Sequence, residues 1–167
     1  MTVTDREAQK LRKKHTGDIL PVDVEIIARG EGIRIESIPL DDALSGMSFI
    51  KDNISYIVVN KNHHINRRRF TIAHEIAHHI LHKEYLMNNV HVDKSILRRE
   101  SFSSSGIDNK EVQANSFAAE LLMPEIEIKK LNKVDINDDT KVSELSKKLK
   151  VSTAALIYRL TNIGHTS

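Results

Sequence analysis

The segment FTIAHEIAHHILH, residues 70–82, places four histidines and one glutamate among aliphatic residues. Within it, His74, Glu75 and His78 have the spacing HExxH. On a helix, residues four apart lie about 40° apart around the axis and about 6 Å apart along it, so two such imidazoles can bind one zinc ion. Glu75 projects about 100° away from His74, where its carboxylate can take a proton from a zinc-bound water. The spacing therefore predicts zinc-dependent hydrolysis of a carbonyl compound.

The residues around this motif distinguish a metal site from a chance match in an ordinary amphipathic helix. Ile72, Ala73, Ile76, Ala77 and Ile80 make the helix apolar enough to be buried. Two histidines and a glutamate buried without partners would cost roughly 1–3 kcal/mol for each group. A metal ion satisfies all three groups at once, which favours the metal site.

A catalytic zinc needs a third protein ligand and an open position. His82 is a poor candidate because it lies about 12 Å from His74 along a straight helix, and His79 points away from the motif face. Glu111 is the better candidate, although Asp108 and Glu111 also fit a helix capping box. Asn115, one turn after Glu111, could accept the outer N–H of a ligand histidine.

The two segments FTIAHEIAHHILH and EVQANSFAAELLMP together resemble the ImmA/IrrE family of bacterial and phage metallopeptidases. The resemblance extends over residues 21–124 and implies a fold in which the HExxH helix packs on the ExxAN helix. It implies that His74 and His78 are zinc ligands, that Glu75 is the general base and that Glu111 is the third ligand, a gluzincin-like set. Asn115 departs from related zinc peptidases, in which an aspartate often follows the glutamate ligand.

The same resemblance implies a substrate, namely a helix-turn-helix transcriptional repressor. Site-specific cleavage of the repressor would release phage, mobile-element or stress genes. The residue that stabilises the oxyanion stays open among four candidates, which are Tyr56, His82, Tyr85 and His91.

The composition limits the kind of protein this is. The sequence has 167 residues, no cysteine and a net charge of +2, so a metal must be held by imidazole and carboxylate groups. Near-balanced charge argues against a general nucleic-acid binder. The charged N-terminal segment lacks the apolar stretch of a signal peptide, and no apolar run reaches membrane-spanning length. We therefore expect a cytoplasmic protein with no membrane partner, while the oligomeric state stays open.

Hydrophobic periodicity and turn residues predict the elements that position the motif. We expect an α+β fold, a mainly helical zincin-like metallopeptidase core with a small antiparallel sheet and C-terminal helices. Residues 1–130 would form the metallopeptidase domain and residues 131–167 a helical segment packed on it. Residues 84–107 show no period and contain a serine cluster, which indicates a mobile segment beside the active site. The expected helices cover residues 3–15, 21–30, 67–82, 108–124 and most of 140–163, and the expected strands cover 33–38, 47–50 and 54–59.

The C-terminal segment SELSKKLKVSTAALIYRL supports a competing function, because it resembles a helix-turn-helix and is rich in basic residues. A DNA-binding or protein-binding regulator that retains the metallopeptidase fold, including a toxin–antitoxin component, is therefore the alternative to a peptidase. We favour amphipathic helices that close the core, since the usual turn glycine is absent and nearby acidic residues oppose phosphate contact.

Overall fold

The computed structural model describes residues 1–94 and 108–167. Its helices are α1 (Val3–His15), α2 (Val24–Gly30), α3 (Ile65–Leu81), α4 (Lys83–Asn88), α6 (Asn109–Leu122), α7 (Glu125–Ile128), α8 (Asp139–Leu149) and α9 (Thr153–Asn162). Its strands are β1 (Ile33–Ile38), β2 (Leu44–Lys51), β3 (Ile54–Asn60) and β4 (His91–Lys94). The predicted α+β class is confirmed.

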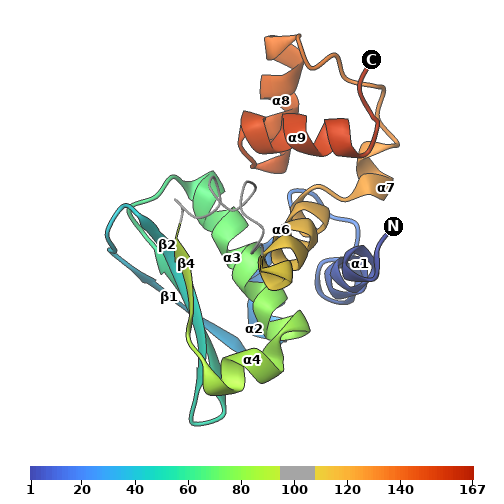
Figure 1. The fold of residues 1–167 in the computed structure, drawn as a ribbon. Coiled ribbons are helices and arrows are strands. Elements are labelled where there is room, and N and C mark those ends of the chain that lie inside the picture. Colours follow the sequence, from blue (N-terminus) through green and yellow to red (C-terminus); the bar gives the residue numbers. More distant parts are fainter. Residues whose placement is uncertain (95–107) are drawn as a thin grey trace.

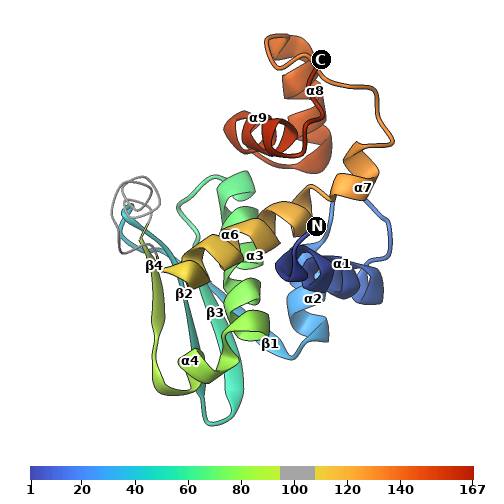
Figure 2. The ribbon, with the colours of Figure 1, turned by 45° about the vertical axis from the view of Figure 1, so that its right-hand side comes forward.

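The strands form one four-stranded sheet in the order β1-β3-β2-β4, and helices cover one of its faces (Figure 1). The expectation of an antiparallel sheet is wrong for one pair of strands. The sheet is mixed, because β1 runs parallel to β3 while the other pairs are antiparallel. Helix α3 lies directly on the sheet, and α6 and α1 follow behind it (Figures 1 and 2). The core therefore fills the space between the sheet and these helices.

The β2–β3 hairpin turns at Asp52 and Asn53, both of which have positive φ. Asparagine and aspartate tolerate this conformation better than most residues, and a two-residue loop of this kind matches the twist of the flanking strands. The turn lies between the two expected strands, 47–50 and 54–59. Lys51, which falls in the gap between them, is the last residue of β2.

Close contacts hold α3 against its neighbours. A Cβ added at Gly46 of β2 would lie 2.9 Å from the Thr71 side chain and 2.5 Å from the backbone oxygen of Val58. Glycine therefore allows β2 to approach α3 closely. Helix α3 also packs on α6, and both helices carry fully buried small residues, namely Ala73, Ala77, Ala114 and Ala118.

The C-terminal helices α8 and α9 pack together at one end of the molecule, beyond α3 and α6 (Figure 2). Arg159 of α9 pairs with the buried carboxylate of Glu120 on α6 and donates to the backbone oxygen of Met123. Asn66, in the first turn of α3, donates to the backbone oxygen of Val151 between α8 and α9. These bonds attach the C-terminal helices to both central helices.

Some expected elements are wrong in detail. The second helix begins at Val24 rather than Pro21, because the Asp23 side chain caps its N-terminus. The segment 84–107 is not a continuous irregular loop, since it contains most of α4 and the whole of β4. The serine cluster of that segment lies outside the described residues.

In the described part of the chain, no helix combines the length and apolar character needed to cross a membrane.

Candidate metal centre

Helix α3 presents two histidine rings on one buried face. The side chains of His74 and His78 are almost completely buried, and their Nε2 atoms lie 3.2 Å apart. This convergence follows from the four-residue spacing, since one helical turn brings both rings to the same side. Burial lowers the pKa of His78 and so favours the neutral ring, the form that binds metals.

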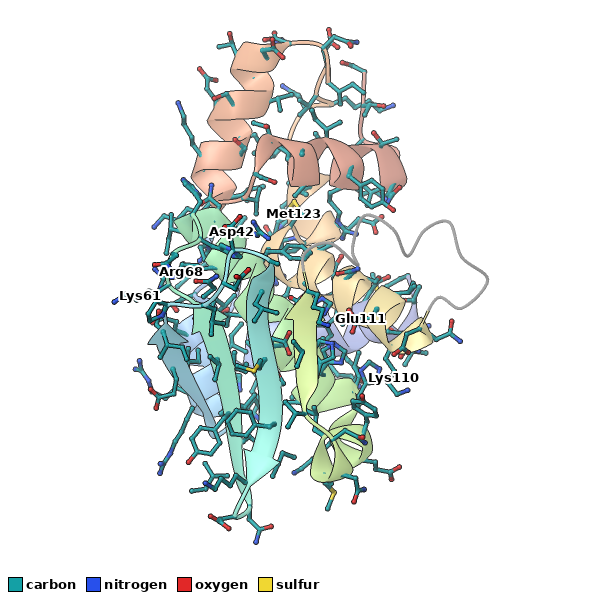
Figure 3. The ribbon with its side chains drawn as sticks, turned by 60° about the vertical axis from the view of Figure 1, so that its left-hand side comes forward. Asp42, Lys61, Arg68, Lys110, Glu111 and Met123 are labelled. Atoms are coloured by element: carbon teal, nitrogen blue, oxygen red, sulfur yellow. The ribbon has the colours of Figure 1, made fainter. Side chains whose placement is uncertain are left out.

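Helix α6 brings a carboxylate to the same point. The Oε2 atom of Glu111 lies 3.2 Å from Nε2 of His74, and its Oε1 atom lies 3.1 Å from Nε2 of His78. Figure 3 shows Glu111 at the N-terminal end of α6, beside β4. The N-terminus of α6 is capped by Asp108, whose side chain accepts a hydrogen bond from the backbone N–H of Lys110. The Glu111 carboxylate is thus directed at the histidines.

The three donor groups have spacings that fit a small tetrahedral metal. Donor atoms at 2.0–2.1 Å from zinc lie about 3.3 Å from one another at the corners of a tetrahedron. The observed separations among His74, His78 and Glu111 are 3.1–3.2 Å. Two neutral imidazoles and one carboxylate are also a donor set that zinc accepts. The residues present therefore fit a zinc ion, and His91 offers a fourth donor atom within 4.8 Å of these three.

The outer nitrogen of each histidine has a hydrogen-bond partner. Nδ1 of His74 lies 2.9 Å from Oδ1 of Asn115, and Nδ1 of His78 lies 3.0 Å from Nδ1 of His82. A ring that donates from Nδ1 directs the lone pair of Nε2 inward. The structure thus places Asn115, the proposed outer partner, beside His74. His82 also belongs to the site, in contact with His78.

Glu75 lies beside the three donors and is held from the sheet. Its Oε2 atom accepts from the Ser48 hydroxyl of β2 and, at 3.0 Å, from Nδ1 of His91 in β4. Among the described residues, its Oε1 atom has no hydrogen-bond partner. Burial raises the pKa of Glu75, but the hydrogen bond and charge of His91 outweigh burial and lower it to about 2. The carboxylate is therefore ionised at neutral pH, with one oxygen held and one available.

His91 connects the two carboxylates. Its Nε2 atom lies 2.7 Å from Oε1 of Glu111, while its Nδ1 atom bonds to Glu75. Burial lowers the pKa of His91, but its hydrogen bonds to Glu111 and Glu75 raise it to about 10. For Glu111, burial opposes ionisation, and the three histidine rings outweigh burial and hold its pKa well below the ordinary range. A negative carboxylate pair and a positive His91 thus border the metal position.

Of the four oxyanion candidates, His91 is the one that contacts Glu75 and Glu111 in the described structure. The Tyr56 ring stacks on Phe49, and His82 contacts the outer side of His78. The Tyr85 ring lies 5.1 Å from the ammonium group of Lys110, the residue that precedes Glu111 (Figure 3).

His79, whose role the sequence left open, points away from the donors. It is buried, and its Nε2 atom donates to the backbone oxygen of Tyr56 at 2.9 Å. It therefore attaches α3 to the sheet.

Sequence reasoning did not identify Ser48 or Asp93 as parts of this site. Ser48 faces His91 across the β2–β4 ladder, and buried Asp93 has a donor atom within 4.8 Å of donor atoms of His74 and Glu75. The alternating side-chain direction of a strand places His91 and Asp93 on the same face. Recognising β4 as a strand paired with β2 would have placed all three residues beside α3.

Comparisons with known proteins agree with this arrangement. The model of a family described as Peptidase_M78, IrrE N-terminal-like domain, matches residues 28–161. A solved structure described as a Mycobacterium tuberculosis transcriptional regulator superposes with a TM-score of 0.64 at 18% sequence identity. That match covers 96% of this chain and 47% of the other, so this chain spans about half the length of its solved relative. No curated protein matches the chain. The family match includes both α3 and α6, the helices that carry the three donor groups.

Proposed function

The chain belongs to the Peptidase_M78 family of IrrE N-terminal-like domains, and from this premise we propose that it is a zinc-dependent endopeptidase that cleaves a helix-turn-helix transcriptional repressor at a specific site. The observation that carries the proposal is the convergence of His74, His78 and Glu111 at the separations of a tetrahedral zinc site. When bound there, zinc supplies Lewis acidity, which acidifies water and polarises a peptide carbonyl.

Glu75 is the proposed general base. Its depressed pKa keeps it ionised at neutral pH, and its Oε1 atom is available to accept a proton from water. Ser48 and His91 hold the other oxygen, so the carboxylate is oriented before substrate arrives. Such fixed orientation lowers the cost of bringing the base to the attacking water. After the water has attacked the peptide carbonyl, the Glu75 carboxylate can pass the proton to the leaving amine.

The substrate class rests on the family resemblance rather than on the metal centre, since a hydrolytic zinc site can act on any amide that reaches it. The solved relative is described as a transcriptional regulator, which is consistent with work in transcriptional control. We expect a cytoplasmic repressor, encoded close to this gene, to be the substrate.

The alternative DNA-binding function is less well supported by the C-terminal helices. Leu149, Leu156 and Leu160 of these helices are buried in the hydrophobic core. Arg159, one of the basic residues of this segment, is paired with Glu120. These contacts support a role for α8 and α9 in closing the core.

The test is to combine the zinc-loaded protein with the repressor encoded beside it and to search for a discrete cleavage product. Glu75→Gln, which preserves the shape of the side chain, serves as the matched inactive variant.

A further inference from the structure

The outer nitrogen of His78 contacts a second imidazole, whereas that of His74 contacts an amide. The two Nδ1 atoms of His78 and His82 lie 3.0 Å apart inside the protein. On its other side, Nε2 of His82 lies 2.7 Å from Oε1 of Gln113. Gln113 is an exposed residue of α6, two positions before Asn115. A continuous chain of hydrogen bonds therefore runs from the protein surface to His78.

Only one arrangement of protons along this chain lets His78 bind a metal. When two neutral rings face each other through their Nδ1 atoms, one donates its proton and the other accepts. If His78 donates, its Nε2 atom keeps a lone pair directed at Glu111 and His74. If His82 donates, the proton of His78 lies on Nε2 and blocks metal binding.

The atom that Gln113 presents selects between these arrangements. The structure directs the carbonyl oxygen of Gln113 at Nε2 of His82, and because this oxygen only accepts, the orientation favours a proton on Nε2 and leaves Nδ1 of His82 as the acceptor. His78 must then donate from Nδ1. A donor group in place of the carbonyl would favour the opposite arrangement.

We propose that Gln113 and His82 are positioning residues that keep the proton of His78 on Nδ1 and thereby hold its Nε2 atom ready for zinc. The inference rests on the zinc site of the proposed function. Asn115 acts on His74 directly, whereas Gln113 acts on His78 through His82. Helix α6 would thus supply one metal ligand and the acceptors that orient the other two.

The test exchanges the acceptor for a group of opposite hydrogen-bonding character. Gln113→Glu can only accept, so the variant should bind zinc at least as tightly as the wild type. Gln113→Lys can only donate, so its zinc affinity should fall by about 10–100-fold, the usual effect of losing an outer partner. Zinc affinity is measured by competition with a chelating dye, which requires no substrate. Because Gln113 is exposed, neither variant disturbs the core.

The matched controls separate hydrogen bonding from simple charge. Val112 is the neighbouring residue of α6, and its side chain is 48% exposed. Val112→Glu and Val112→Lys place the same two charges beside the site without a hydrogen bond to His82. The ratio of zinc affinities between Glu and Lys should be at least about tenfold larger at position 113 than at position 112. Equal ratios at the two positions would overturn the relay.

A second readout locates the protons themselves. In the metal-free wild type, nitrogen NMR of the histidine rings should show the proton of His78 on Nδ1 and that of His82 on Nε2. A His82 ring that carries its proton on Nδ1, or on both nitrogens, would contradict the proposal. If the wild type binds no zinc, the proposed function fails together with the relay. If it binds zinc and only the predicted difference at position 113 is missing, the relay alone fails.

Discussion

The Nε2 atom of His78 lies 3.1 Å from the Oε1 atom of Glu111, and the two atoms come from different helices. The N-terminal end of α6 therefore crosses α3 where the HExxH motif presents its histidines. This relationship makes the packing of α3 on α6 a requirement for metal binding, and it leads to predictions about the donors, the base and the residues that hold the base.

The first prediction concerns the third ligand. Glu111→Ala should lower zinc affinity by more than the 10–100-fold typical of an outer partner, because it removes a donor atom from the metal. Metal analysis after dialysis measures the loss, and Glu144→Ala, which removes an exposed carboxylate from α8, is the control. Full zinc retention in Glu111→Ala would restrict Glu111 to a role in the first turn of α6.

The second prediction concerns the base. Glu75→Gln should keep zinc but lose cleavage by roughly 10²–10⁴-fold, the range that general base catalysis supplies. The amide preserves the size of the side chain and cannot take up the proton. Zinc content and rate are measured on the same preparation. Wild-type cleavage by a zinc-loaded Glu75→Gln protein would exclude this carboxylate as the base.

The third prediction concerns Ser48, which is fully buried and donates to the ionised carboxylate of Glu75. Ser48→Ala should destabilise the metal-free protein by about 1.5–3 kcal/mol, as expected for a hydrogen bond to a charged group. Ser146→Ala is the matched control, because Ser146 is also buried but donates to a neutral backbone oxygen. Its cost should be about 0.5–1.5 kcal/mol. Urea unfolding measures both values, and a smaller loss for Ser48→Ala would contradict the charged bond.

The fourth prediction concerns the pH dependence of the metal-free protein. The folded protein raises the pKa of His91 from 6.5 to about 10, so the stability from this group is complete below 6.5 and is lost as the pH rises through 10. Glu75 has a lowered pKa, so its contribution is present above 4.5 and is lost as the pH falls toward 2.

His91→Gln should remove the alkaline part of this dependence. Unfolding free energies of the wild type and the variant, measured between pH 6.5 and 10, provide the test. The wild-type value should fall relative to that of the variant, by up to about 1.4 kcal/mol for each pH unit. If the unfolding free energies of the wild type and the variant changed equally with pH, folding would not raise the pKa of His91.

The local part of the site could be predicted from the sequence, because HExxH spacing depends only on helical geometry. Glu111 was harder, since the sequence around it also fits a capping box. The structure separates the two interpretations by assigning the cap to Asp108 and directing Glu111 toward the histidines.

The remaining residues depend on tertiary pairing that no local pattern records. β4 has only four residues, too few for a clear period, and its pairing with β2 brings His91 opposite Ser48. The parallel pairing of β1 with β3 was likewise missed, because hydrophobic alternation does not reveal strand direction.

The central claim is that the zinc-loaded protein cleaves a helix-turn-helix repressor. The most direct measurement is mass spectrometry of the repressor encoded beside this gene after co-expression with the wild type and, in parallel, with Glu75→Gln. We expect two fragments from a single peptide bond with the wild type and an intact repressor with Glu75→Gln. An intact repressor with the wild type, under inducing conditions and with zinc confirmed in the protein, would contradict it.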